Sequence, residues 1–166
     1  MSSADPTVEQ RLQHLEDLES IRRLKARYCD RCDDGYDPDG IAELFTADGV
    51  WDGGRTFGRR EGRDAIRRYF EGSAGRITVA RHHVTNSVID VDGDTAGGRW
   101  MLFQPCVESS VASAVWLSAT YHDTFRRVAG AWYFSSLSID VAFFTPYEKG
   151  WAKQRYLPGR EPRTDG

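Results

Sequence analysis

The feature that most constrains the fold is a change of hydrophobic period near Gly75. Before it, apolar residues recur every three or four positions, most regularly over residues 8–32, which predicts a long amphipathic helix. After it, apolar and polar residues alternate over long stretches, which predicts strands. Helices segregated from a run of antiparallel strands indicate an α+β fold with one curved, mixed but mainly antiparallel sheet. The predicted buried stripe of the helix consists of Leu12, Leu15, Leu18, Ile21, Leu24, Tyr28 and Cys32.

Shorter patterns divide the rest of the chain into further elements. Turn signals at 92–94 and 129–130 predict hairpins between long strands. Because the first helix can cover the apolar face of the sheet, we expect a cone-shaped barrel whose mouth forms one ligand pocket. We predict a flexible lead over residues 1–8, a single domain over 9–146 and an irregular tail over 147–166. The predicted short helices cover 39–45 and 63–70, and the predicted strands cover 50–52, 56–58, 77–91, 95–108, 112–128 and 131–144.

The composition argues against several classes of protein. The formal net charge is −3, whereas a domain that binds nucleic acid is normally basic, so we expect no nucleic-acid partner. No stretch approaches the roughly 20 apolar residues that span a membrane, so we expect no membrane partner either. The first residues lack the apolar core of a signal peptide, and the cysteines number three. An odd number of cysteines without a secretion signal predicts a reducing, cytoplasmic location.

Two of the cysteines have the spacing of redox and zinc-binding pairs. Cys29 and Cys32 form a Cys-x-x-Cys pair at the end of the predicted first helix. Redox pairs of this kind usually open a helix that follows a strand. A zinc site would need further ligands, and Cys106 alone does not complete a tetrahedral set. The sequence also lacks a glycine-rich nucleotide motif. We therefore expect neither a metal nor a cofactor.

Several local phrases resemble the nuclear transport factor 2-like superfamily, and SnoaL-like domains in particular. The phrases are LEDLESIR at 15–22, DGIAELF at 39–45, GRDAI at 62–66 and DGDTA at 92–96. The resemblance implies the cone-shaped fold, which hosts enzymes and non-enzymes alike. Within the superfamily, the chain looks most like the branch that contains scytalone dehydratase, bile-acid 7α-dehydratase and hexachlorocyclohexane dehydrochlorinase.

The enzymes of that branch resemble one another in two residues. They have an Asp at the end of the first helix and a His early in a central strand. Asp33 and His82 stand at the matching positions here, and Tyr28 matches the pocket tyrosine of the bile-acid enzyme. Scytalone dehydratase has a second pocket histidine after a proline in the next strand, where this chain has Pro105 and Cys106. The resemblance therefore implies a simple Asp–His pair.

Elimination of water or halide explains what these residues would do. A base must remove a C–H proton while the leaving group is assisted and water is excluded. Histidine, with an unperturbed pKa of about 6.5, suits the base role. A carboxylate on its other ring nitrogen fixes the tautomer. We predict that His82 takes the proton, Asp33 orients His82, and Tyr28 donates a hydrogen bond to the substrate.

Structural roles are the alternatives for the same residues. His83 points to the opposite face of a regular strand, and a bulge would exchange it with His82. Tyr28 belongs to the buried stripe, where it could simply pack. Asp33 could cap the helix end or form a turn. The predicted substrate-binding residues are Trp51, Phe57, Phe103, Cys106 and Trp116.

We predict a cofactor-independent lyase that acts on a small hydrophobic ring compound such as a polyketide, steroid or terpenoid. An isomerase or cyclase could use the same pair of residues. A non-catalytic binding module, or an accessory subunit resembling the β subunits of ring-hydroxylating dioxygenases, is a further alternative. The resemblance also implies a homo-oligomer, either a trimer or a dimer.

Overall fold

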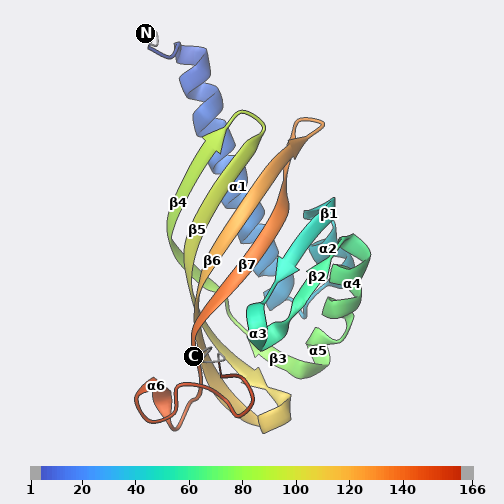
Figure 1. Cartoon of the computed structure of the whole chain (residues 1–166), viewed down its shortest axis with the longest axis vertical. Coiled ribbons are helices and arrows are strands. Elements are labelled where there is room, and N and C mark those ends of the chain that lie inside the picture. The colour runs from blue at the N-terminus through green and yellow to red at the C-terminus, as the bar shows by residue number, and fades with distance from the viewer. Residues whose placement is uncertain (1–4, 162–166) are drawn as a thin grey trace, which may run out of the picture.

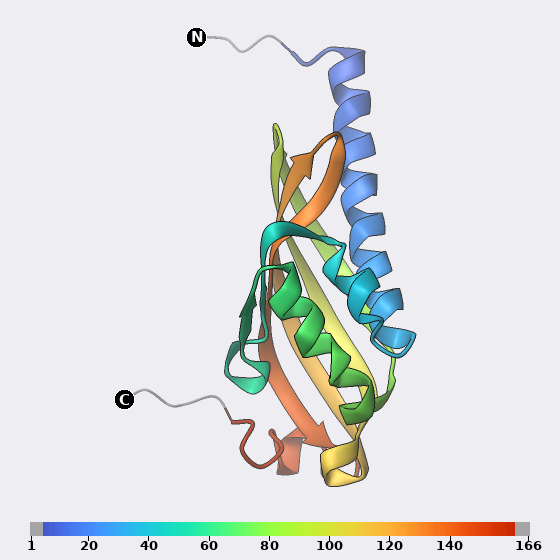
Figure 2. The ribbon, with the colours of Figure 1, turned by 90° about the vertical axis from the view of Figure 1, so that its right-hand side faces the viewer.

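The computed structural model describes residues 5–161, in which a long helix crosses one face of a curved sheet (Figures 1 and 2). The short helices α2 and α4 pack together beside β1. This arrangement confirms the predicted α+β fold. The helices are α1 (Val8–Asp33), α2 (Pro38–Ala42), α3 (Gly54–Phe57), α4 (Arg63–Glu71), α5 (Ser73–Arg76) and α6 (Gly150–Lys153). The strands are β1 (Phe45–Asp52), β2 (Arg59–Glu61), β3 (Ile77–Ala80), β4 (His83–Asp92), β5 (Thr95–Glu108), β6 (Ser113–Val128) and β7 (Ala131–Pro146).

The long helix α1 begins with a capping box. Thr7 Oγ1 accepts a hydrogen bond of 3.2 Å from the backbone N–H of Gln10, and Gln10 Oε1 accepts one of 2.8 Å from the N–H of Thr7. These two bonds satisfy donors that a helix N-terminus otherwise leaves unpaired. The chain therefore enters the helix at Val8, the first residue of the predicted segment.

The predicted buried stripe of α1 is correct only for its second half. Ile21, Leu24 and Tyr28 are buried, whereas Leu12 and Leu15 are 55% and 61% exposed. The first turns of α1 extend past the ends of the strands, so no sheet lies beneath them (Figures 1 and 2). Periodicity reports that a helix is amphipathic, but it does not report how much of the helix has a partner.

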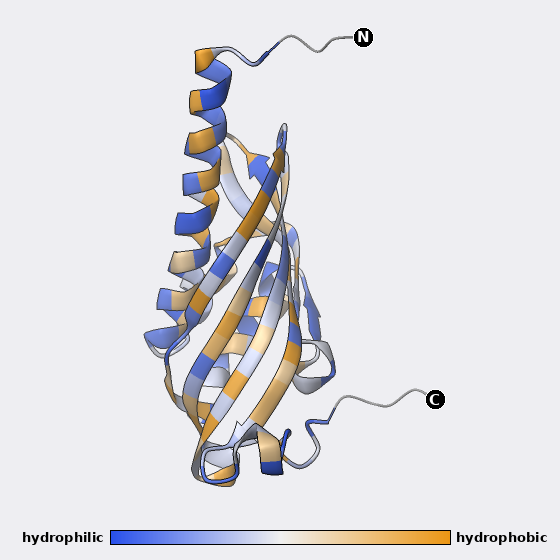
Figure 3. Ribbon diagram, turned by 90° about the vertical axis from the view of Figure 1, so that its left-hand side faces the viewer, coloured by the Kyte–Doolittle hydropathy of each residue, from blue (hydrophilic) through white to orange (hydrophobic). Residues whose placement is uncertain are grey.

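The sheet has the order β2-β1-β7-β6-β5-β3, and β4 also pairs with β5. Strands β1 and β7 are parallel, and the other pairings between the described strands are antiparallel. Apolar and polar bands alternate along the strands (Figure 3). On β5 the side chains of Trp100, Leu102, Gln104 and Cys106 are buried, which fixes the face of the sheet that points into the core.

The predicted strand at 56–58 is wrong. The chain forms the helical turn α3 instead, and the short strand β2 follows it. Gly54 and Gly58 bound this turn with φ angles of 58° and 78°, a region that favours glycine. The backbone N–H of Gly53 closes the loop with a 2.9 Å hydrogen bond to the carbonyl of Gly58.

The predicted strand at 77–91 is interrupted at Arg81 and His82, which separate β3 from β4. The backbone N–H of His82 donates to the carboxylate of Asp33, at 3.0 Å from Oδ2. The carboxylate of Asp33, at the end of α1, therefore accepts a hydrogen bond that the N–H of His82 would donate to a neighbouring strand if β3 and β4 were continuous.

The residues after β7 return to the sheet. Leu157 is 3% exposed, and its N–H donates a 2.7 Å hydrogen bond to the carbonyl of Phe144. Part of the predicted tail thus covers the end of β7. Residues 1–4 of the predicted lead and 162–166 of the predicted tail lie outside the described residues.

Candidate active site

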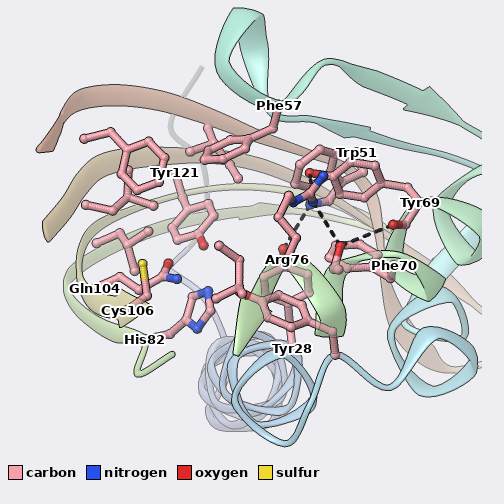
Figure 4. Close-up of a pocket in the computed structure, with 17 residues that line it drawn as sticks. Tyr28, Trp51, Phe57, Tyr69, Phe70, Arg76, His82, Gln104, Cys106 and Tyr121 are labelled. Atoms are coloured by element: carbon pink, nitrogen blue, oxygen red, sulfur yellow. Dashed lines mark hydrogen bonds between the residues drawn. The ribbon is translucent and has the colours of Figure 1, made fainter. Parts of the chain in front are cut away.

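A pocket lies between the C-terminal half of α1, the α4–α5 segment and the inner face of the sheet (Figure 4). Its empty volume is about 530 Å³, including the open mouth. Aromatic and aliphatic side chains form most of the lining, with a few polar groups among them, which is the usual composition of a small-molecule site. The polar side chains that line it include His82, Gln104, Ser73 and Arg76.

His82 and Asp33 form a close pair at one side of this pocket. His82 Nδ1 lies 2.5 Å from Asp33 Oδ1, and the backbone N–H of His82 donates to the same carboxylate. The His82 side chain is only 5% exposed and lines the pocket, whereas Asp33 lies behind it. His82 Nε2 has no hydrogen-bond partner among the described residues. Asp33 therefore fixes both the ring and the backbone of His82.

The environment of Asp33 keeps its carboxyl group ionised. Burial raises the pKa of Asp33, but the hydrogen bonds from the ring and backbone of His82 lower it, and the charges of His82 and Arg81 add to this effect. The net result is a pKa below the usual value of an aspartate. An ionised carboxylate can only accept a hydrogen bond, so it favours the tautomer with the proton on Nδ1.

Tyr28 projects from α1 into the pocket lining. Its hydroxyl accepts a 2.9 Å hydrogen bond from Trp51 Nε1. Burial raises the pKa of Tyr28 well above its usual value, so the hydroxyl keeps its proton. Aromatic rings surround it, including Phe45, Phe70 and Tyr121. The structure therefore places Tyr28 in the pocket and in the core at the same time.

The predicted substrate-binding residues divide between the two faces of the sheet. Trp51, Phe57 and Cys106 line the pocket. Phe103 and Trp116 instead stack on each other outside the pocket lining, with ring centroids 5.2 Å apart, and Phe103 is 39% exposed. Neighbouring residues of a strand point to opposite faces, and the buried neighbours of Phe103 on β5 leave it the outer one.

His83 follows directly after His82 but faces away from the pocket. It is the first residue of β4 and is exposed, and it does not line the pocket. The exchange of the two histidines that a bulge would produce therefore does not occur.

Sequence analysis missed several polar groups of the pocket. Gln104 is 4% exposed and lies beside His82 and Cys106 (Figure 4). Its alternation with Leu102 and Cys106 is the signal that could have placed it on the inner face. Arg76 ends the short helix α5 and gave no periodic signal.

The three cysteines are free and buried. Burial raises the pKa of Cys29 and of Cys106 to about 12, so both thiols stay protonated. Protonated thiols are poor nucleophiles and poor metal ligands. Within residues 5–161, no group of three or more His, Cys, Asp or Glu side chains could hold a metal ion. No helix of that range is long and apolar enough to cross a membrane.

The fold of this chain has counterparts in known proteins. The family model of the SnoaL-like domain matches residues 13–138, so the chain belongs to the SnoaL-like family. A comparison with curated protein sequences gives no match.

Solved structures with the same fold include proteins named for different activities. A scytalone dehydratase candidate from Novosphingobium aromaticivorans is 27% identical, with a TM-score of 0.73 over 81% of this chain and 89% of that one. An aromatic ring hydroxylase candidate from the same species is 25% identical, with a TM-score of 0.74 over 80% and 94%. The hexachlorocyclohexane dehydrochlorinase of Novosphingobium barchaimii is 20% identical, with a TM-score of 0.75 over 89% and 99%. At that identity the last comparison shows the fold alone.

Proposed function

We propose that this protein is a cofactor-independent lyase that eliminates water or a comparable leaving group from a small, hydrophobic ring compound. The observation that carries the proposal is the 2.5 Å contact between Asp33 Oδ1 and His82 Nδ1 at the edge of an aromatic pocket. The similarity to a scytalone dehydratase candidate supports the same class of reaction.

In the proposed reaction, His82 is the general base. Asp33 accepts the hydrogen bond from Nδ1, which leaves Nε2 as the basic nitrogen of the neutral ring. Nε2 removes a proton from the carbon next to the one that holds the leaving group. Asp33 then stabilises the imidazolium that forms, because a carboxylate beside it offsets the new positive charge.

Tyr28 is the proposed acid partner. Its hydroxyl keeps its proton, because burial raises its pKa, and it already accepts the Trp51 N–H. In the proposed reaction the O–H exchanges its contact with the Cys32 thiol for a hydrogen bond to a substrate carbonyl or to the departing hydroxyl. Such a donor stabilises charge that develops on oxygen as the C–H bond breaks.

Isomerisation and cyclisation are the closest alternatives because both can begin with the same proton abstraction. The products separate them. An elimination lowers the mass of an alcohol substrate by one water, whereas an isomerase or cyclase product keeps the mass of its substrate. A protein that binds the substrate without changing it would be a binding module or an accessory subunit.

A screen with hydroxylated ring ketones, followed by mass spectrometry and by absorbance of the new conjugated double bond, tests the proposal. We expect His82→Ala to lower turnover by about 10²- to 10⁴-fold, the usual contribution of a general base. His83→Ala is the matched control, because it changes an exposed neighbouring histidine outside the pocket. Full turnover in His82→Ala would refute the proposed role.

We also propose three further properties: a cytoplasmic location, no nucleic-acid partner, and assembly into a homo-oligomer. The last is supported by the exposed apolar side chains of Val8, Leu12 and Leu15 on the projecting turns of α1. Light scattering coupled to size exclusion would distinguish a monomer, a dimer and a trimer.

A further inference from the structure

Arg76 is a cation in the lining of a mainly apolar pocket, and the proposed elimination does not use it. Its Nη2 donates to the hydroxyl of Tyr69 at 3.0 Å and to Ser73 Oγ at 3.1 Å, and Figure 4 shows both bonds. These are neutral acceptors, so they leave the guanidinium charge unbalanced. Nε and Nη1 have no partner among the described residues.

Two more arginines stand close to the same group of rings. The guanidinium of Arg60 lies 4.7 Å from the centroid of Tyr69, and that of Arg76 lies 5.1 Å from it. Arg160 lies 5.8 Å from the ring of Phe57, another residue of the lining. None of the three forms a salt bridge with a carboxylate in residues 5–161.

Some other arginines of this chain are paired with acids. Arg59 bridges Asp52 and Glu61, and Arg127 bridges Asp17 and Asp94. Exposed arginines such as Arg22, Arg68 and Arg99 also lack a carboxylate partner among the described residues, but water screens their charge. The three arginines beside the pocket are half-buried, so their charge is screened less. Like charges that gather without an anion raise the local positive potential and attract one.

We propose that the substrate carries a carboxylate, and that Arg76 is the specificity residue that binds it. This inference rests on the proposed function, because it assigns the substrate class of the same pocket. The free Nε–H and Nη1–H groups of Arg76 can each donate a charge-assisted hydrogen bond to a carboxylate. Arg60 and Arg160 add positive potential around Tyr69 and Phe57.

The position of Arg76 also orients the substrate. His82 lies with Gln104 and Cys106 on one side of the pocket, and Tyr69 lies with Trp51 on the other (Figure 4). A carboxylate held by Arg76 on the Tyr69 side directs the rest of the ring compound across the aromatic lining toward His82. Small cyclic acids are accordingly the preferred substrates, including hydroxylated ring ketones that carry a carboxylate, and their neutral amides lack the anchor.

The test compares benzoate with benzamide, which have the same shape and differ in charge. NMR titration or calorimetry at low ionic strength gives the two affinities. We expect the wild type to bind benzoate about tenfold more tightly or better, because a charge-assisted bond exceeds a neutral one by that amount or more. Arg76→Met should abolish this preference, and Arg76→Lys should keep part of it.

Arg68→Met is the matched control, since it removes the same charge from an exposed residue of α4 outside the pocket. It should leave the preference for benzoate unchanged. Because Arg76 also holds Tyr69 and Ser73, the melting temperature of each variant is measured alongside, and Arg76→Lys supplies the answer if Arg76→Met does not fold. Equal affinities for the two probes, no benzoate binding, or an unchanged preference in a folded Arg76 variant would overturn the inference.

The binding test and the turnover test can fail separately. Benzoate selectivity that depends on Arg76, without any turnover of cyclic hydroxy acids, would keep the anion site and refute the lyase. Turnover that depends on His82, without benzoate selectivity, would keep the lyase and refute the anion site.

Discussion

Two of the acid–base pairs that α1 forms with the rest of the fold differ in what they face. Lys25 Nζ donates to Asp123 Oδ2 at 2.9 Å, and both side chains are essentially inaccessible, at 1% and 0% exposure. Eight positions further along the same helix, Asp33 meets His82 at the pocket, with side-chain exposures of 19% and 5%. One pair is sealed in the core, and the other is open to a ligand.

The surroundings of the sealed pair indicate a structural role. Lys25 Nζ lies 3.2 Å from the centroid of Tyr121 and 5.4 Å from that of Trp100. Burial raises the pKa of Asp123, and the charge and hydrogen bond of Lys25 oppose this rise. The same kind of contact thus stabilises the fold where aromatic rings close over it, and becomes available for chemistry where a pocket reaches one partner.

The largest effect that this comparison predicts is on stability. Lys25→Met leaves the carboxylate of Asp123 buried without its partner, so we expect the free energy of unfolding to fall by about 3–5 kcal/mol. The double variant Lys25→Met/Asp123→Leu removes both charges and should recover most of that loss. Urea unfolding followed by tryptophan fluorescence measures the free energy of unfolding of the wild type and of both variants. If Lys25→Met costs no more than the double variant, the pair does not stabilise the core as described.

A smaller effect is expected at the open pair, and it depends on pH. Because the pKa of Asp33 is below its usual value of 3.8, its contribution to stability is present above that pH and is lost as the pH falls through the lower, folded-state value. The stability difference between the wild type and Asp33→Asn should therefore shrink as the pH falls below about 3.8. Unfolding curves at several pH values measure it. A difference that grows toward low pH would contradict the assigned direction.

Much of the fold could be predicted because hydrophobic periods are local. The helical period of residues 8–32 and the alternation of the long strands each survive in the structure. The exposed Leu12 and Leu15 show the limit, since a period cannot say where the sheet beneath the helix ends. The turn at Gly54–Phe57 was missed because two glycines with positive φ decide it, and not a side-chain pattern.

Residues of the candidate site could be predicted where the resemblance named them. They could not be predicted where the direction of a side chain determines whether it lines the pocket. Asp33 and His82 are 49 positions apart, and only the resemblance suggested that they meet. Phe103 and Gln104 are neighbours on β5 that face opposite sides, and a shift of one residue would exchange them. Arg76 follows no period at all, so its place in the pocket emerges only from the packing of α5.

The most direct test of the central claim is the imidazole NMR spectrum of His82 in the wild type and in Asp33→Asn. We expect a low-field Nδ1 proton in the wild type and an Nε2 nitrogen shift typical of an unprotonated ring nitrogen, because an ionised Asp33 holds the proton on Nδ1. In Asp33→Asn the low-field proton should move upfield or disappear, since a neutral amide accepts a weaker bond. His82 resonances that are identical in the two proteins would contradict the pairing on which the proposed function depends.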